Sequence, residues 1–174
     1  MKISYSAAPT PAQREAAADL IDAGGQLAEK LDRAKFARAC VIVTALDAAG
    51  RVIGVGAVKE RRGSIAELGY LMVDPEFRRR GIAQELTRRR IAAARDAGLE
   101  LLFTNVRRDN VESRGNLHKA GFVLWGDFMS AYHTQRVISW FYYPLTAEAR
   151  VEAHLKPLTR KLPKAPTGGS PPRR

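Results

Sequence analysis

The sharpest chemical signal in the chain is the segment Val73–Ala83, which reads Val-Asp-Pro-Glu-Phe-Arg-Arg-Arg-Gly-Ile-Ala. It joins the end of a predicted strand to the first turn of a predicted helix. Free N–H groups at a helix N-terminus attract anions, and Gly81 lets a ligand approach the backbone. The arginines at 78–80 add formal charge. The segment lacks the glycine patterns of a nucleotide triphosphatase and of a dinucleotide site, so it predicts an anion site of another kind.

The elements that position this segment follow from hydrophobic spacing and turn residues. Strands are predicted at residues 2–6, 40–46, 51–58, 67–73, 101–106, 122–130 and 137–143, and helices at 11–22, 26–37, 81–98 and 109–120. Thr10 is the expected N-cap of the first helix, and Asp109 with Glu112 has the spacing of a capping box. Three strands in a row, followed by strands that alternate with helices, predict an α/β (α+β) fold: a mixed, mainly antiparallel central sheet of about seven strands with helices on both faces.

Arg90 interrupts the pattern of the helix that follows Gly81. Its neighbours on that helix face are apolar, among them Leu86 and Ala94. A charged side chain in the middle of such a face must either extend to the rim or find a partner.

Composition and charge limit the classes of protein that fit. The 174 residues, 45% of them hydrophobic and 27% charged, suit one compact domain with a terminal appendage. The single cysteine, Cys40, predicts no metal site and favours a reducing compartment. Without a membrane span or the apolar stretch of a signal peptide, the expected location is cytoplasmic. Lys plus Arg number 29 against 18 Asp plus Glu, a net charge of +11, which favours an anionic partner.

Much of that charge lies near the C-terminus. Residues 146–174 are basic and rich in proline, and they are predicted to be a tail that is disordered in its last part. Such a tail is either a solubilising appendage or an electrostatic tether to RNA or another polyanion.

The anion segment resembles the acyl-CoA signature of the GNAT superfamily of N-acetyltransferases. The match is Arg78-x-x-Gly81-x-Ala83, preceded by Val73-x-Pro75. A second block, Asn110-x-x-Ser113 followed by Lys119-x-Gly121-Phe122, is similar to the family's later helix and strand. The predicted order of strands and helices is also the family's order. The resemblance covers residues 1–145 as a GNAT-like domain and leaves residues 146–174 outside.

This resemblance implies transfer of an acetyl group from acetyl-CoA to a primary amine by direct attack in a ternary complex. A primary amine of pKa near 10.4 is mostly protonated at pH 7, so a base must accept its proton. Glu67 stands where some family members place that base; a solvated strand-edge charge is the alternative. A backbone N–H around Met72–Asp74 would stabilise the developing oxyanion. The residues implied in acetyl-CoA binding are Met72, Val73, Arg78, Arg79, Arg80, Gly81, Ile82, Ala83, Asn110 and Ser113. For Asn110 and Ser113, capping of the helix is the alternative.

The chain departs from the family at the general acid, because Leu117 stands where many members have a tyrosine. Ser113, His118 or Tyr132 would have to substitute, or water would protonate the thiolate. The departure motivates a second hypothesis, an acyl-CoA-binding regulatory domain without turnover. A third is a basic nucleic-acid-binding protein that uses the tail and the arginines at 88–90.

The acceptor amine is not identified by any motif. In the last strand, one of the pairs Trp140/Tyr142 and Phe141/Tyr143 must face away from the core. That face is expected to line the acceptor pocket or to form a homodimer seam. His133 is expected in the loop before that strand, where it is a candidate for acceptor contact.

Overall fold

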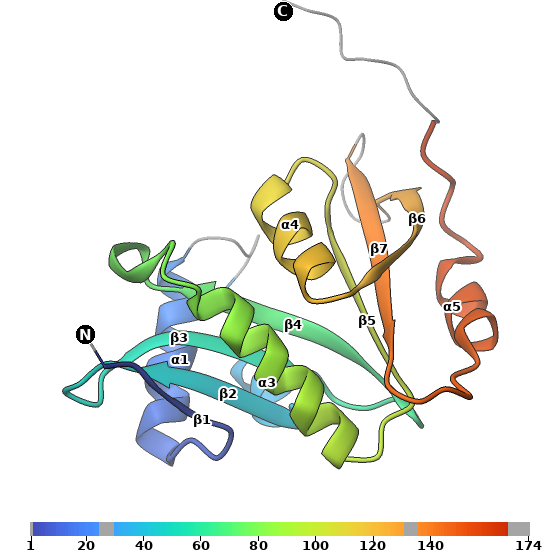
Figure 1. The fold of residues 1–174 in the computed structure, drawn as a ribbon. Helices are drawn as coiled ribbons and strands as arrows, with labels where there is room; N and C mark the ends of the chain where they lie inside the picture. Colours follow the sequence, from blue (N-terminus) through green and yellow to red (C-terminus); the bar gives the residue numbers. More distant parts are fainter. Residues whose placement is uncertain (1, 25–29, 131–135, 167–174) are drawn as a thin grey trace, which may run out of the picture.

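The computed structural model describes residues 2–24, 30–130 and 136–166. Within these residues the strands are β1 (Ser4–Ser6), β2 (Val41–Leu46), β3 (Val52–Val58), β4 (Ile65–Val73), β5 (Leu101–Arg107), β6 (Val123–Met129) and β7 (Val137–Pro144). The helices are α1 (Pro11–Ala23), α2 (Arg33–Ala37), α3 (Ile82–Asp96), α4 (Val111–Lys119) and α5 (Val151–Thr159), with a short 3-10 turn, η1 (Pro75–Phe77). All the strands form one sheet in the order β1-β2-β3-β4-β5-β7-β6 (Figure 1).

Only the β4–β5 pair is parallel among these strands, and the other neighbours are antiparallel. The predicted mixed and mainly antiparallel sheet is therefore confirmed.

Helices cover both faces of this sheet. In Figure 1, α3 and α4 lie in front of the sheet and α1 lies behind it. Successive strand residues point to opposite faces, and the core follows this alternation. Ala66 and Leu102 pack in the cluster with α3 and α4, while their neighbours Ile65 and Phe103 pack with Leu155 of α5. The helices α1, α2 and α5 thus share the face opposite α3 and α4.

Local capping explains where the helices begin. Thr10 caps α1, accepting from the Gln13 N–H at 3.3 Å while the Gln13 side chain accepts from the Thr10 N–H at 2.9 Å, as predicted. The cap of α4 differs from the prediction. The Asn110 side chain accepts from the Ser113 N–H at 3.0 Å, so Asn110 replaces Asp109 as the cap.

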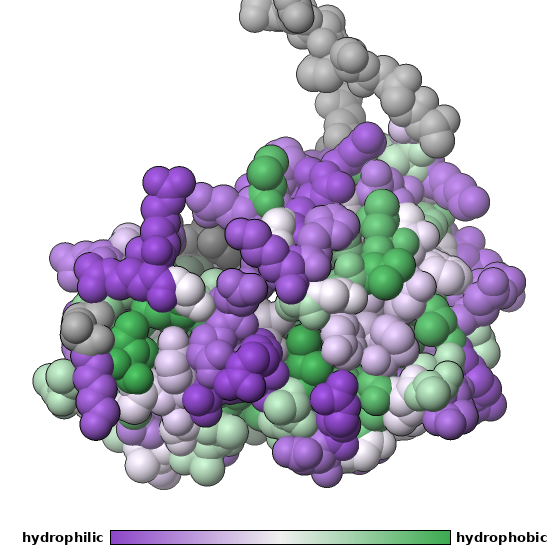
Figure 2. All heavy atoms as spheres, in the orientation of Figure 1, coloured by the Kyte–Doolittle hydropathy of each residue, from purple (hydrophilic) through white to green (hydrophobic). Residues whose placement is uncertain are grey.

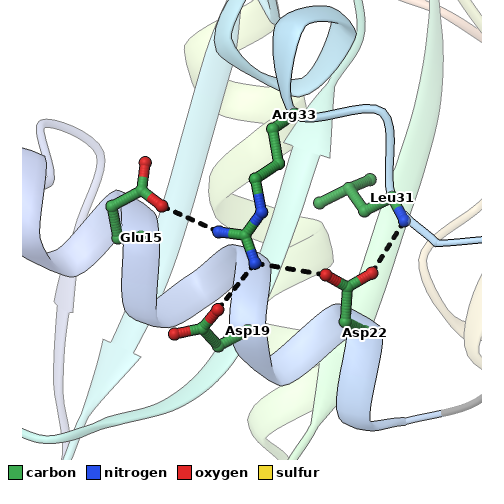
Figure 3. A network of polar contacts seen from close by, with 5 residues as sticks. All are labelled: Glu15, Asp19, Asp22, Leu31 and Arg33. Atoms are coloured by element: carbon green, nitrogen blue, oxygen red, sulfur yellow. Dashed lines mark hydrogen bonds and ion pairs between the residues drawn. The ribbon is translucent and has the colours of Figure 1, made fainter.

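The helix predicted at 26–37 is described only as α2, from Arg33; residues 25–29 lie outside the described part. Asp32 caps α2 by accepting from the Lys35 N–H at 3.0 Å. Arg33 then ties α2 to α1, with its guanidinium 2.7 Å from Glu15 and 2.6 Å from Asp19 (Figure 3). It also reaches Asp22, whose other oxygen accepts from the backbone N–H of Leu31. These contacts fix the ends of the connection between the two helices.

The central feature of the sheet is the separation of β4 from β5. Their register runs only from Ile65/Leu101 to Glu67/Phe103. The Thr104 hydroxyl then donates to the Leu68 carbonyl at 2.8 Å. From there β4 continues to Val73 beside β3, with an irregularity in the β3–β4 register between Val55 and Ala57. The half of β4 beyond Leu68 therefore has no paired strand on its β5 side within the described chain.

The C-terminal region differs from the predicted tail. Residues 151–159 form α5, and Leu155 is fully buried against the sheet. Further on, the Met129 N–H donates to the Pro163 carbonyl and the Ala165 N–H donates to the Asp127 carbonyl. The apolar residues Val151, Leu155 and Leu158 recur at helical spacing, and this stripe explains the docking. Residues 167–174 lie outside the described part. No helix among the described residues is long and apolar enough to span a membrane.

Candidate active site

The predicted anion segment forms a tight turn between β4 and α3. The Asp74 side chain accepts from the Glu76 N–H at 3.0 Å and starts η1. Arg79 and Gly81 then adopt positive φ angles of 60° and 77°. A glycine takes the left-handed conformation at little cost, and this explains Gly81 at the N-cap of α3.

The N-terminus of α3 is open to a ligand. The first helical hydrogen bond runs from the Glu85 N–H to the Gly81 carbonyl at 3.0 Å, so the N–H groups of Ile82, Ala83 and Gln84 precede the helical ladder. Gly81 supplies no side-chain cap, and a Cβ at Gly81 would meet no described heavy atom within 4 Å. This end of the helix therefore has donors and space.

The charge around this turn is strongly positive. All three arginines at 78–80 are exposed. Arg78 donates from Nε to the Val73 carbonyl at 3.3 Å, and the Arg80 guanidinium stacks 5.3 Å from the Phe77 ring. Figure 2 shows strongly hydrophilic side chains gathered where η1 and the start of α3 lie in Figure 1. The nearby carboxylate Glu85 bonds Arg88 and Arg89, and these hydrogen bonds lower its pKa to about 2.

The buried side chains in the predicted cofactor set face the core. Met72 is 4% exposed and packs toward α1, while Val73 and Ile82 pack in the cluster with Leu86. Only the backbone of these residues is available to a ligand. A cavity of about 520 Å³ adjoins the turn. Its lining comes from α3, the end of α4 and β7, and includes Gly81, Arg88, Arg95, Lys119 and Tyr143.

Glu67 forms the last pair of the β4–β5 ladder, with Phe103. It shares a sheet face with Ile65 and so points away from α3. Its Oε1 lies 2.6 Å from the Nζ of Lys59, and the two side chains are 24% and 32% exposed. Lys59 Nζ in turn lies 5.1 Å from the centre of the Tyr70 ring. Glu67 is thus partly buried and ion-paired, not a free edge charge.

Tyr70 and Lys59 are the residues that the sequence did not reveal. Tyr70 has φ 53° at the irregularity between β3 and β4, and its ring packs edge-on against Phe36 at 5.4 Å. The pairing of Lys59 with Glu67 follows from the hairpin register, in which the Lys59 N–H donates to the Glu67 carbonyl at 2.8 Å. The short predicted turn at 61–63 was the available signal, but it did not fix that register.

Arg90 lies on the α3 side of the same stretch of β4 and is 1% exposed. Its guanidinium donates to the Gly69 carbonyl at 3.0 Å and to the Thr87 hydroxyl at 2.9 Å, with longer bonds to the carbonyls of Ala57 and Leu86. Burial lowers the pKa of Arg90 to about 9, so it is charged at pH 7. Of the two expected outcomes, Arg90 therefore finds buried partners and does not extend to the rim. These partners are backbone carbonyls and a hydroxyl.

Helix α4 contributes less than its motif suggests. Asn110 caps the helix with its side chain, and the backbone of Ser113 is the donor in that cap. Leu117 is 5% exposed and packs in the cluster with Phe122 and Phe141. Its neighbour Asn116 instead faces α3, donating to the Thr87 hydroxyl at 2.9 Å.

The remaining candidates for the general acid or for contact with the acceptor amine lie in three places. The ring centre of His118 lies 5.2 Å from that of Phe141. Tyr132 and His133 lie outside the described residues. In β7, Phe141 is core, whereas Trp140 stacks on Phe103 at 5.9 Å and Tyr142 packs near Trp125 in the cluster with α5. Part of the aromatic face that the sequence left open is therefore covered by α5.

The chain belongs to the acetyltransferase (GNAT) family, because the model of that family matches residues 7–122. This confirms the predicted family, and with it an enzyme of the N-acetyltransferase class.

Solved structures share the fold at low sequence identity. A GNAT-family protein from Desulfovibrio desulfuricans matches with a TM-score of 0.73 at 15% identity, over 83% of this chain and 100% of its own. A Salmonella typhimurium protein solved with acetyl-CoA gives 0.72 at 16% identity, over 86% and 97%. The Escherichia coli ribosomal-protein-S18-alanine N-acetyltransferase gives 0.69 at 18% identity, over 86% and 97%. A search of curated protein sequences returned no match.

Proposed function

We propose that this protein is an acetyl-CoA-dependent N-acetyltransferase that transfers the acetyl group directly to a primary amine. The observation that carries the proposal is the uncapped N-terminus of α3, with its left-handed Gly81, at the end of the strand that separates from β5. Family membership supplies the chemistry. The solved Salmonella relative, which was determined with its cofactor acetyl-CoA, supports the choice of acyl donor.

The turn suits the pyrophosphate of acetyl-CoA. The free N–H groups of Ile82–Gln84 donate to an anion, and the helix dipole adds to their effect. Arg78, Arg79 and Arg80 supply charge around the same turn, and Gly81 leaves the backbone open. The cavity of about 520 Å³ along α3 and α4 continues from Gly81 to Lys119 and offers room for the nucleotide portion.

The unpaired half of β4 suits the acyl-bearing arm. Backbone groups on an open strand edge bind an extended ligand as a neighbouring strand would. N–H groups near Met72–Asp74 are candidates to stabilise the oxyanion that develops on the thioester oxygen. The same strand carries Glu67, where the β4–β5 ladder ends.

We assign Glu67 as the base that accepts the proton of the amine. It is partly buried and already binds an ammonium group, that of Lys59, at 2.6 Å. The pairing shows that an ammonium group fits against this carboxylate, and a general base must come within hydrogen-bond distance of the proton that it accepts. In this proposal the departing thiolate takes its proton from water. Leu117, at the position where many family members have a tyrosine, is buried in the core and has no acidic proton to give.

Calorimetric titration of acetyl-CoA into wild type and Gly81→Glu tests the cofactor site. Gly63→Glu is the matched control, because Gly63 also has a positive φ, 63°, and open space around its Cβ position, but it lies at the other end of β4. We expect binding to wild type and to the control, and none to Gly81→Glu. Equal binding by both variants would contradict the assignment.

Turnover is tested separately by CoA release in the presence of primary amines. We expect release by wild type and a loss of about 10²–10⁴-fold for Glu67→Gln, the contribution typical of a positioned base. Acetyl-CoA binding with no release for any amine would favour the regulatory, catalytically silent domain over the transferase.

A further inference from the structure

Among the described residues, Lys59 places its ammonium group against the proposed base, and the proposed reaction gives this lysine no role. Its Nζ lies 2.6 Å from Glu67 Oε1. An acceptor amine has to reach that carboxylate to lose its proton. The lysine therefore occupies the position that an acceptor would need.

The aliphatic part of the Lys59 side chain lies over β4, the strand on which the proposed function places the acyl donor. Lys59 directly follows β3, and its N–H bonds the Glu67 carbonyl at 2.8 Å. A Cβ built on Gly69 would lie 2.4 Å from Lys59 Cε and 3.3 Å from its Nζ. Gly69 belongs to the half of β4 that has left the β5 ladder. The missing side chain at Gly69 is what lets the lysine lie there.

The surroundings of the ammonium also suit an acceptor. The Tyr70 ring lies 5.1 Å from Nζ, an arrangement that holds a cation without taking a proton from it. Tyr70 adopts its positive φ at this point, and strained backbone concentrates at functional sites. The lysine is 32% exposed and its ion pair is partly solvated, so the pair is weak enough to be released.

We propose that Lys59 is a site of self-acetylation, modified by the acetyl-CoA bound to the same molecule. This inference rests on the proposed transferase function. The Lys59 ammonium gives a proton to the Glu67 carboxylate, and the neutral Nζ attacks the thioester carbon. The new N–C amide bond forms as the C–S bond breaks, and the CoA thiolate leaves and takes up a proton. The products are Nζ-acetyl-lysine at position 59 and free CoA.

Self-acetylation would change the charge of the site. An acetylated lysine carries no positive charge and cannot pair with a carboxylate. Glu67 would then be left without the cation that it binds at 2.6 Å. The Glu67 carboxylate is then available to pair with the ammonium of an external acceptor.

The test is incubation of the full chain with acetyl-CoA, followed by digestion and mass spectrometric quantification of acetylation at each lysine. Lys156 is the matched internal control, because it also pairs with a glutamate, Glu152 at 2.5 Å, but on the exposed side of α5. We expect Lys59 to be modified about a hundredfold faster than Lys156, since a positioned base contributes roughly 10²–10⁴-fold. The rate constant should not depend on protein concentration.

Two variants and one reagent make the outcome decisive. Glu67→Gln should remove the preference for Lys59, and Lys59→Arg should lose the modified peptide. Acetic anhydride, used without acetyl-CoA, reports the intrinsic reactivity of each lysine, and with it Lys59 should not exceed Lys156.

Three results would overturn the proposal: equal rates at Lys59 and Lys156 with acetyl-CoA, the same preference with acetic anhydride, or a rate constant that rises with protein concentration. The acetyl-CoA titration separates this failure from failure of the proposed function. If acetyl-CoA binds and an external amine is acetylated while Lys59 is not, only self-acetylation is wrong. If acetyl-CoA does not bind, both proposals are wrong.

Discussion

Gly56→Ala is the substitution that best tests the architecture behind the site. Gly56 lies in β3 beneath the buried guanidinium of Arg90. A Cβ at this position would lie 2.8 Å from Nε, 2.9 Å from Cζ and 3.0 Å from Cδ of Arg90. The guanidinium cannot yield freely, because it donates to the Gly69 carbonyl and to the Thr87 hydroxyl at 3.0 and 2.9 Å.

The expected cost is a penalty at the guanidinium less a gain from the unfolded chain. The new methyl group either overpacks the core, which costs about 1–3 kcal/mol, or displaces Arg90 and breaks one hydrogen bond from a charged group, which costs about 1.5–3 kcal/mol. Replacing glycine by alanine recovers about 0.4–1 kcal/mol through the unfolded chain. We therefore expect Gly56→Ala to lower the free energy of unfolding by about 2 kcal/mol.

Arg90→Met provides the second arm of a double-mutant cycle. Methionine has a length similar to that of arginine but makes no hydrogen bonds to hold it in place, and its flexible side chain can move away from the new methyl group. In the Arg90→Met background we expect Gly56→Ala to cost less than about 1 kcal/mol, a coupling of about 1–2 kcal/mol.

Urea unfolding measures each free energy, with the m-value as a check on two-state behaviour. Gly54→Ala is the control on the same strand, because its Cβ would meet Ile82, Leu86 and Ala45 instead of Arg90. Its cost should be the same in both backgrounds. If Gly56→Ala costs the same with arginine or methionine at position 90, the close contact with the guanidinium is not the source of the cost.

Three further outcomes follow from the structure. Leu155→Ala should lower the free energy of unfolding by about 2–5 kcal/mol in thermal or urea unfolding, because Leu155 is fully buried. A cost near zero would show that α5 does not pack against the sheet. The pKa of Glu100 is lowered from 4.5 to about 2, first by the Arg150 N–H and then by Ser64 and His154. The ionised Glu100 therefore stabilises the folded state above pH 4.5, and this stabilisation is lost as the pH falls toward 2. The free energies of unfolding of wild type and Glu100→Gln should differ at about pH 7 and become equal near pH 2. Leu117→Tyr should overpack the core and lower the free energy of unfolding by about 1–3 kcal/mol, without increasing CoA release.

The order of strands and helices along the chain and the anion turn were predictable because their signals are local. Strand and helix periods, together with Gly81 at a helix start, depend on residues close in sequence. The docking of α5 was missed for a different reason. Proline and basic residues dominate the composition of 146–174, and they hide the apolar stripe of Val151, Leu155 and Leu158. Composition alone cannot detect an apolar helix stripe, because the stripe becomes favourable only when it packs against the sheet.

The pairings inside the site could not be predicted from the sequence. Lys59 meets Glu67 only through the register of the β3–β4 hairpin, and a shift of one residue would turn both side chains to the other face. The sequence offered both Asp109 and Asn110 as caps of α4, and the choice between them depends on one residue of register. The family motif located the turn correctly, yet it carried no information about Arg90 or Lys59.

Backbone strain is concentrated where the sheet opens. The non-glycine residues with positive φ among those described are Tyr70 and Arg79, and they bracket the end of β4 and the turn after it. Such conformations cost about 1–3 kcal/mol each and persist only where surrounding contacts hold them. Phe36 packs against the Tyr70 ring on one face, and Arg90 binds the Gly69 carbonyl from the other. These contacts hold β4 in its irregular path, and the strand edge that begins just beyond Glu67 has no paired strand among the described residues. A rigid, open strand edge binds an extended ligand without first having to break a sheet, which is the physical reason to place the acyl donor there.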